Sequence, residues 1–170
     1  MVDKSELLDF LGILDKHMEK QIELIAVGGT AMTLLGIKTS TIDIDFEVKP
    51  EDFPALKTAL NIPHGYRIDV FTNGLIFSQQ LPADYREKSM PIKNFKNIRL
   101  LALHPIDIVV TKIGRLNERD KEDIKSCIKK FGLTRRQIKE RAKKVEYVGK
   151  EEFYKDSLEH VIKFFFGSVK

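Results

Sequence analysis

The chain of 170 residues has one cysteine, Cys127, and no long apolar run. A single cysteine excludes an internal disulfide, which fits the reducing cytoplasm. No apolar stretch approaches the roughly 20 residues that a membrane-spanning helix needs, and the acidic N-terminal segment lacks the basic start and apolar core of a signal peptide. We therefore expect a cytoplasmic protein without a membrane partner, with Cys127 as a buried, inert thiol.

Patterns typical of several kinds of catalytic site are also missing. Cysteine and histidine do not occur at spacings that bind zinc, and the four histidines are scattered along the chain. No serine–histidine or cysteine–histidine arrangement suggests a covalent nucleophile. These absences direct attention to chemistry based on carboxylates, backbone N–H groups and charge.

The order of expected elements predicts an α+β fold with a small mixed sheet flanked by helices and a helical C-terminal part. A chain of this length forms one domain, or one domain with a helical appendage. We expect the domain over residues 1–132 and the helical extension over residues 133–170. Apolar periodicity and turn residues predict strands at 24–27, 42–48 and 66–71, and a hairpin at 90–95 and 98–103.

Helices are expected around these strands, with a loop or short helix over 72–86. Capping-box patterns, Asp3 to Glu6 and Thr134 to Gln137, mark two helix starts. Gly132 and Gly149 mark two helix ends. The expected helices comprise one containing residues 7–18, then 30–35, about 51–60, 105–113, 120–131, a basic helix after residue 134, and 151–166.

Asp43 and Asp45 are the first candidate site residues. Side chains of a strand alternate between its two faces, so both aspartates project the same way, about 7 Å apart, while Ile44 points into the core. Aligned carboxylates repel each other unless a cation lies near them, and Mg²⁺ prefers oxygen ligands from carboxylates and phosphates. The alternative is a strand edge that simply faces water.

Gly28 and Gly29 follow the first buried strand and open a short helical segment. Glycines there allow a sharp turn whose N–H groups approach a phosphate, with the Thr30 hydroxyl as a further contact. Asp69, in a second apolar stretch, is a candidate ligand for a second metal ion. The alternatives are a plain tight turn and a structural carboxylate.

These motifs resemble those of the DNA polymerase β-type nucleotidyltransferase superfamily, above all its small stand-alone enzymes related to the toxins of abortive-infection (toxin–antitoxin) systems. The resemblance covers residues 24 to 123. The similar residues are Val27-Gly28-Gly29, Asp43-Ile44-Asp45-Phe46 and Arg67-Ile68-Asp69-Val70.

The resemblance implies a Mg²⁺-dependent nucleotidyltransferase that works with two metal ions. Such an enzyme moves a nucleoside monophosphate from a nucleoside triphosphate (NTP) to a hydroxyl of RNA, such as tRNA, or of a protein. It also implies nucleotide contacts from Thr41 and Lys112 and, for a toxin-type enzyme, an antitoxin partner. A solvated Lys112 is the alternative. Asp120 and Asp123 fit an architectural role better, with Asp120 capping a helix.

The C-terminal part concentrates positive charge, ten lysines and arginines between residues 125 and 150. Helical spacing places Arg136, Lys139 and Lys143 on one strip, which we expect to contact RNA phosphates. A solvated helix face is the alternative. Two other functions therefore stay open, a non-catalytic nucleotide- or RNA-binding module and a structural subunit acting through its helical end.

Overall fold

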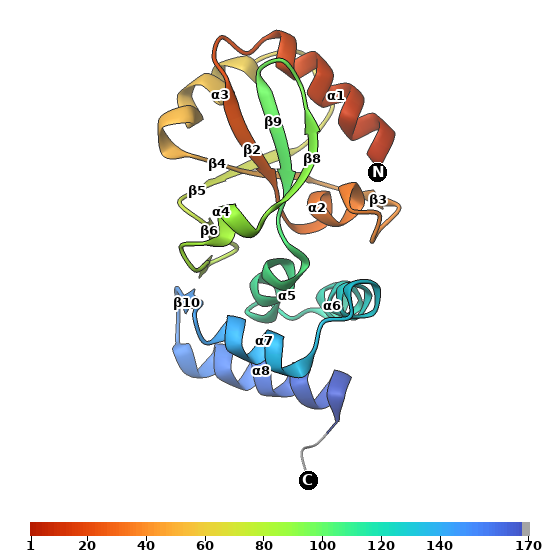
Figure 1. Ribbon diagram of the computed structural model, residues 1–170, viewed down its shortest axis with the longest axis vertical. Coiled ribbons are helices and arrows are strands. Elements are labelled where there is room, and N and C mark those ends of the chain that lie inside the picture. The colour runs from red at the N-terminus through yellow and green to blue at the C-terminus, as the bar shows by residue number, and fades with distance from the viewer. Residues whose placement is uncertain (168–170) are drawn as a thin grey trace. The chain divides into compact units, whose positions relative to one another are not determined.

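A computed structural model describes residues 1–167 and confirms the α+β class (Figure 1). By internal contacts the chain divides into two compact units. We call residues 1–73 with 86–103 the sheet unit, and residues 74–85 with the chain from 104 onward the helical unit. The boundary predicted after residue 132 lies within the helical unit, and as a statement about separate domains it stays a prediction.

The sheet unit holds the larger sheet and the first three α-helices. Its elements are β1 (Val2–Asp3), α1 (Lys4–Lys16), β2 (Ile22–Ala26), α2 (Gly28–Leu34), β3 (Ser40–Thr41), β4 (Ile44–Val48), a 3₁₀ turn (Pro50–Asp52), α3 (Phe53–Ala59), β5 (Ile68–Thr72), β8 (Met90–Asn94) and β9 (Ile98–Ala102).

The helical unit follows the chain from β6 onward. Its elements are β6 (Leu75–Ile76), β7 (Gln79–Gln80), α5 (Pro105–Ile113), α6 (Glu118–Phe131), α7 (Arg135–Ala142), β10 (Glu146–Tyr147) and α8 (Glu151–Phe166). The short helix α4 (Tyr85–Lys88) crosses the boundary between the units. No helix within residues 1–167 is both long and apolar enough to span a membrane.

The main sheet has the strand order β5-β4-β2-β9-β8. Strands β4 and β5 run parallel, as do β2 and β9, and the other neighbours are antiparallel. Ile44, Phe46 and Val48 are fully buried on one face of β4. Because side chains alternate, the neighbouring positions Asp45 and Glu47 belong to the opposite face. The predicted strands 42–48 and 66–71 are thus confirmed, each beginning two residues later than expected.

Most helix boundaries agree with the capping residues in the sequence, but Gly149 does not end the basic helix as predicted: α7 ends at Ala142, and β10 lies between it and Gly149. The predicted capping boxes of α1 and α7 are both present, with reciprocal bonds between Asp3 and Glu6 and between Thr134 and Gln137. Helix α6 begins at Glu118, because Asn117 is its N-cap and Asp120 is the return acceptor of a third box. Cys127 on α6 is buried, as predicted.

A small antiparallel sheet in the helical unit was not predicted. Strands β6 and β7 form a hairpin in the segment 72–86, and β10 adds to the other edge of β7. The turn between β6 and β7 contains Phe77 and Ser78 with φ of 48° and 68°, an uncommon conformation for non-glycine residues. Two-residue strands show no hydrophobic period, so this pairing escapes sequence analysis.

Candidate functional site

Two of the three predicted aspartates lie side by side on adjacent strands of the sheet unit. Asp45 on β4 is in direct register with Asp69 on β5. Asp43 was predicted to lie in the same strand as Asp45, but it lies in the bend one residue before β4. Neighbouring strands are about 4.8 Å apart, and positions i and i+2 of one strand about 7 Å. The pairing of β4 with β5 therefore brings together residues that are 24 positions apart in sequence.

The three carboxylates differ in their surroundings. Asp45 is 8% exposed, the Asp43 side chain is 42% exposed, and Asp69 is exposed. Arg67 Nε lies 4.0 Å from Asp43 Oδ1, at a largely exposed position. The Asp69 carboxylate makes no hydrogen bond or ion pair with any residue among 1–167. Asp43 and Asp69 thus present carboxylate charge to solvent, with Arg67 at a distance from Asp43 that gives only a weak ion pair.

Two threonine hydroxyls hold the backbone of the aspartate pair. Thr41 Oγ1 donates to the Asp43 carbonyl at 2.9 Å, and Thr30 Oγ1 donates to the same oxygen at 3.2 Å. Thr30 Oγ1 also accepts the Asp45 N–H at 2.9 Å. Each threonine hydroxyl can donate one proton, and both threonines donate theirs to the Asp43 carbonyl oxygen. In this structure the two hydroxyls position the backbone of Asp43 and Asp45, and the predicted contact of Thr30 and Thr41 with the nucleotide stays a prediction.

The glycine turn adjoins the aspartate pair. Val27, the N-cap of α2, donates its N–H to the Asp45 carbonyl at 3.0 Å. Gly28 has φ of 54°, in the left-handed region that favours glycine. A Cβ on Gly29 would meet Thr41 Oγ1 at 2.7 Å, so a side chain there would push Thr41 away from Asp43. Both glycines are therefore required by the geometry that holds Asp43 and Asp45.

These residues fit a divalent cation that binds together with a phosphate ligand. Within residues 1–167, no group of three or more His, Cys, Asp or Glu side chains is arranged to hold a metal ion by itself. Mg²⁺ is commonly bound by one or two carboxylates, with waters and substrate phosphates completing its shell. The hard oxygen donors of Asp43, Asp45 and Asp69 suit that mode.

Comparison with protein-family models agrees with this geometry. Residues 6–165 match the model of a family described as a nucleotidyltransferase of unknown function (DUF6036). The chain belongs to this family. The match confirms the nucleotidyltransferase type predicted from the glycine and aspartate motifs. No curated protein matches the chain.

Lys112 is buried, whereas the resemblance implied a lysine that contacts the nucleotide. Its side chain is 4% exposed, and its Nζ lies 2.9 Å from Asp123 Oδ2 and 3.4 Å from Asp120 Oδ1. Burial by itself raises the pKa of Asp120, but the Arg115 hydrogen bond, the Lys112 charge and the Asn117 N–H together hold this pKa below its usual range. Lys112 therefore belongs to a compensated ion-pair cluster of the helical unit, and its contact with a nucleotide stays a prediction.

Sequence analysis missed a fourth carboxylate on the aspartate face, Glu47. It follows Asp45 by two residues and is fully buried, with Arg86 Nη2 at 2.9 and 2.7 Å from its two oxygens. Arg86 Nη1 also donates to Glu23 Oε1 on β2 at 3.1 Å. The alternation Asp43, Asp45, Glu47 could have identified this position. Its arginine partner, far away in sequence, could not have been found.

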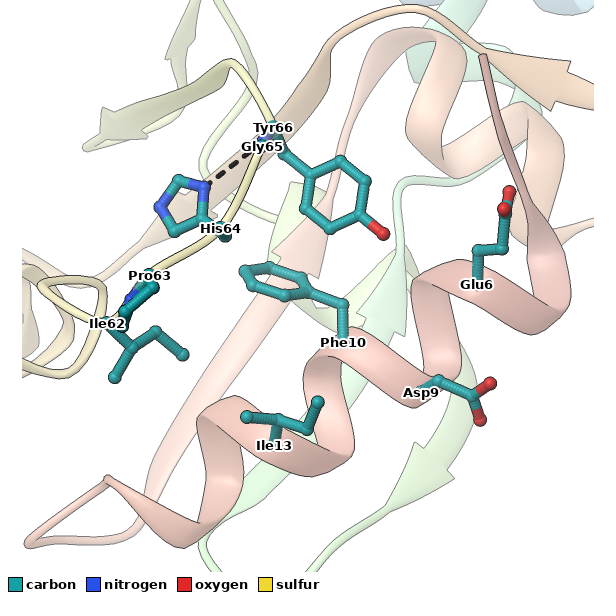
Figure 2. A pocket seen from close by; sticks show the side chains of 9 residues that line it. All are labelled: Glu6, Asp9, Phe10, Ile13, Ile62, Pro63, His64, Gly65 and Tyr66. Carbon is teal, nitrogen blue, oxygen red and sulfur yellow. Dashed lines mark hydrogen bonds between the residues drawn. The ribbon is translucent and has the colours of Figure 1, made fainter.

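A hollow of about 450 Å³ lies in the sheet unit between α1 and residues 62–66, which precede β5 (Figure 2). Figure 2 shows the ring of Phe10 on α1 facing Tyr66 and His64, which precede β5; the ring centroids are 5.1 and 5.6 Å apart. The residues that line this hollow include none of Asp43, Asp45, Glu47 and Asp69, so it is not part of the carboxylate site.

Proposed function

We propose that this protein transfers a nucleoside monophosphate from an NTP to a hydroxyl group of an acceptor and releases pyrophosphate. In this reaction the acceptor oxygen forms a bond with the α-phosphorus, and the bond from that phosphorus to the bridging oxygen of the β-phosphate breaks. The acceptor proton leaves to solvent. Such transfer depends on positioning and charge neutralisation, so a covalent protein nucleophile is not required.

The register of Asp45 with Asp69, next to the glycine turn, is the observation that carries this proposal. Asp43 and Asp45 would hold one Mg²⁺ with the triphosphate, and Asp69 would contribute to a second. When bound, these ions neutralise phosphate charge and make the acceptor hydroxyl more acidic. Gly28 and Gly29 open α2, where N–H groups have no acceptor from an earlier helical turn, and they are our candidates for phosphate contact.

The acceptor in this proposal is a hydroxyl of RNA, with tRNA as the first candidate, or of a protein. The resemblance to abortive-infection toxins extends the proposal to a toxin-type enzyme controlled by an antitoxin protein. Growth of cells that express the wild-type protein, compared with cells that express a site variant, tests this extension separately from the chemistry.

The decisive experiment compares the wild-type protein with Asp43→Asn/Asp45→Asn. We expect Mg²⁺ with an NTP to raise the wild-type melting temperature, since a ligand that prefers the native state stabilises it. Labelled NTP should be incorporated into cellular RNA or into protein. The double variant should lose the nucleotide-dependent shift and the incorporation, because the neutral amides bind Mg²⁺ poorly. Circular dichroism without ligand checks that the variant is folded.

Glu51→Gln is a matched control, because it removes an exposed carboxylate at the start of the 3₁₀ turn. It should behave as wild type. If the double variant binds the nucleotide as tightly as the wild type does, Asp43 and Asp45 do not form a metal site. A wild-type protein that binds NTP and Mg²⁺ but gives no turnover with RNA or protein acceptors would favour the non-catalytic binding module.

A further inference from the structure

A groove runs between α7 and α8 within the helical unit. The two helices lie side by side (Figure 1) and enclose a volume of about 510 Å³. One wall carries cations at four-residue intervals on and after α7, and α8 supplies the others. The five lining cations are Arg135, Lys139, Lys143, Lys155 and Lys163.

The positive charge of this groove is largely uncompensated. Arg135, Lys139, Lys143 and Lys163 make no ion pair with any residue among 1–167. Lys155 pairs with Glu151 at 3.4 Å, where both side chains are mostly exposed. Glu159 is the one carboxylate among the lining residues that the structure describes. Rows of cations of which four out of five have no ion-pair partner raise the local positive potential and attract a ligand with regularly repeated negative charge.

The spacing of the cations suits a nucleic-acid backbone. From Arg135 to Lys143 a helix rises about 12 Å, because each residue adds about 1.5 Å. At about 3.4 Å per phosphate along one stacked strand, this length corresponds to roughly three phosphates. Leu158 and Ile162 form an apolar floor that suits sugars and base faces. The described lining has no aromatic ring for base stacking, so binding should depend on backbone charge more than on sequence.

We propose that this groove binds the phosphate backbone of single-stranded RNA and thereby makes RNA the acceptor class. The inference rests on the proposed function only where it calls the RNA an acceptor; binding itself can be measured without turnover.

The groove replaces the strip that sequence analysis predicted. Lys139 and Lys143 line it, but Arg136 does not: its Nε donates to Glu140 Oε1 at 2.9 Å, and its side chain is 86% exposed. Arg135 takes its place. The residues 135, 139 and 143, each four apart, form the row that faces α8.

The test measures binding of a labelled, unstructured oligouridine over a range of salt concentrations. Each phosphate contact adds about 0.7 to the slope of log affinity against log salt. Arg135→Gln/Lys139→Gln/Lys143→Gln should therefore flatten this slope by about 2 and weaken binding roughly 100-fold at 0.1 M salt. The control Lys129→Gln/Arg136→Gln/Lys144→Gln removes the same charge from exposed positions outside the groove and should retain near wild-type binding.

Glu159→Gln gives the opposite test, because it removes the negative charge of the groove and should tighten RNA binding. Equal loss of affinity in both triple variants would overturn the groove and indicate net charge alone. So would polyglutamate competing better than RNA, which would indicate an acidic protein partner. The groove variant should keep the nucleotide-dependent thermal shift. RNA that binds in the groove but receives no nucleotide would overturn RNA as the acceptor class and leave the groove as a binding site. Only the absence of transfer to protein as well would reject the proposed function.

Discussion

In the helical unit, Asp107, Asp120 and Asp123 each lie against a cation of the same unit, whereas in the sheet unit the Asp69 carboxylate meets none. Arg141 Nε and Nη2 donate to Asp107 at 2.6 and 2.9 Å, and Arg141 Nη1 donates to Asp84 at 2.7 Å. Asp69 faces solvent beside Asp45 on the neighbouring strand. Asp107, Asp120 and Asp123 are thus neutralised by cations of the protein itself, whereas Asp69 has no cation partner among the described residues.

This difference separates carboxylates that support the fold from those suited to function. A buried ion pair is costly to break, because the remaining charge loses its partner in a poorly solvated site. An exposed carboxylate beside another like charge contributes nothing comparable to folding. Removal of an aspartate should therefore affect stability in the helical unit and turnover in the sheet unit.

The largest effect should come from Asp69→Asn. If Asp69 helps to activate the acceptor, its loss removes transition-state stabilisation while most triphosphate contacts survive. We expect turnover to fall roughly 10³-fold, which corresponds to about 4 kcal/mol in the activation barrier. Nucleotide affinity and melting temperature should change little. Steady-state kinetics measures the turnover, and a nucleotide titration measures the affinity. Near wild-type turnover would show that Asp69 is structural.

Asp120→Asn should show the reverse pattern. Its loss leaves the nearly buried Lys112 with one partner fewer, and we expect the free energy of unfolding to fall by about 3 kcal/mol at pH 7. Chemical denaturation followed by circular dichroism provides the measurement. Asp69→Asn is the matched control, since it makes the same chemical change at an exposed position and should cost less than about 0.5 kcal/mol.

The same variant has a pH signature. The pKa of Asp120 is lowered in the folded protein, so its stabilising contribution is present above the unfolded aspartate pKa of about 3.9 and is lost as pH falls through the lower folded pKa. The stability difference between wild type and Asp120→Asn should shrink as acid is added below about pH 4. A difference independent of pH would mean that packing, not the charge, stabilises the cluster.

How far the sequence predicts each unit depends on the range of the interactions. Strand alternation places Asp45 on the face opposite Ile44 and Phe46 because that period is local, and capping boxes span only three residues. The register of Asp45 with Asp69 depends on pairing between distant strands. The hydrogen bonds that fix Thr30 and Thr41 likewise need the folded arrangement of α2, β3 and β4.

Arg141 illustrates a signal that was present but not used. It was counted only as one of the ten lysines and arginines of the basic segment, yet it is 6% exposed and bound to Asp107 and Asp84. It shares a stripe with Ile138, Ala142 and Val145, at the i, i+3, i+4 and i+7 spacing of a buried helix face. At this position the helical periodicity predicts burial better than the charge of the residue does. Arg141 can be buried because Asp107 and Asp84, from other parts of the chain, compensate its charge.

The smallest expected effect on turnover comes from Thr30→Val, which changes the hydrogen bonds that hold Asp43 and Asp45 but not their charge. Thr30 is fully buried, and replacing it with valine leaves the Asp45 N–H without its acceptor, at a cost of about 1–3 kcal/mol in stability. Asp45 then loses a fixed position, so turnover should fall roughly tenfold, or about 1.4 kcal/mol. Thr30→Ser keeps the hydroxyl and should restore most of the turnover despite the missing methyl group. If serine and valine lower turnover equally, Thr30 acts through its packing, and the positioning of Asp43 and Asp45 must depend on Thr41 and on the Val27 N–H.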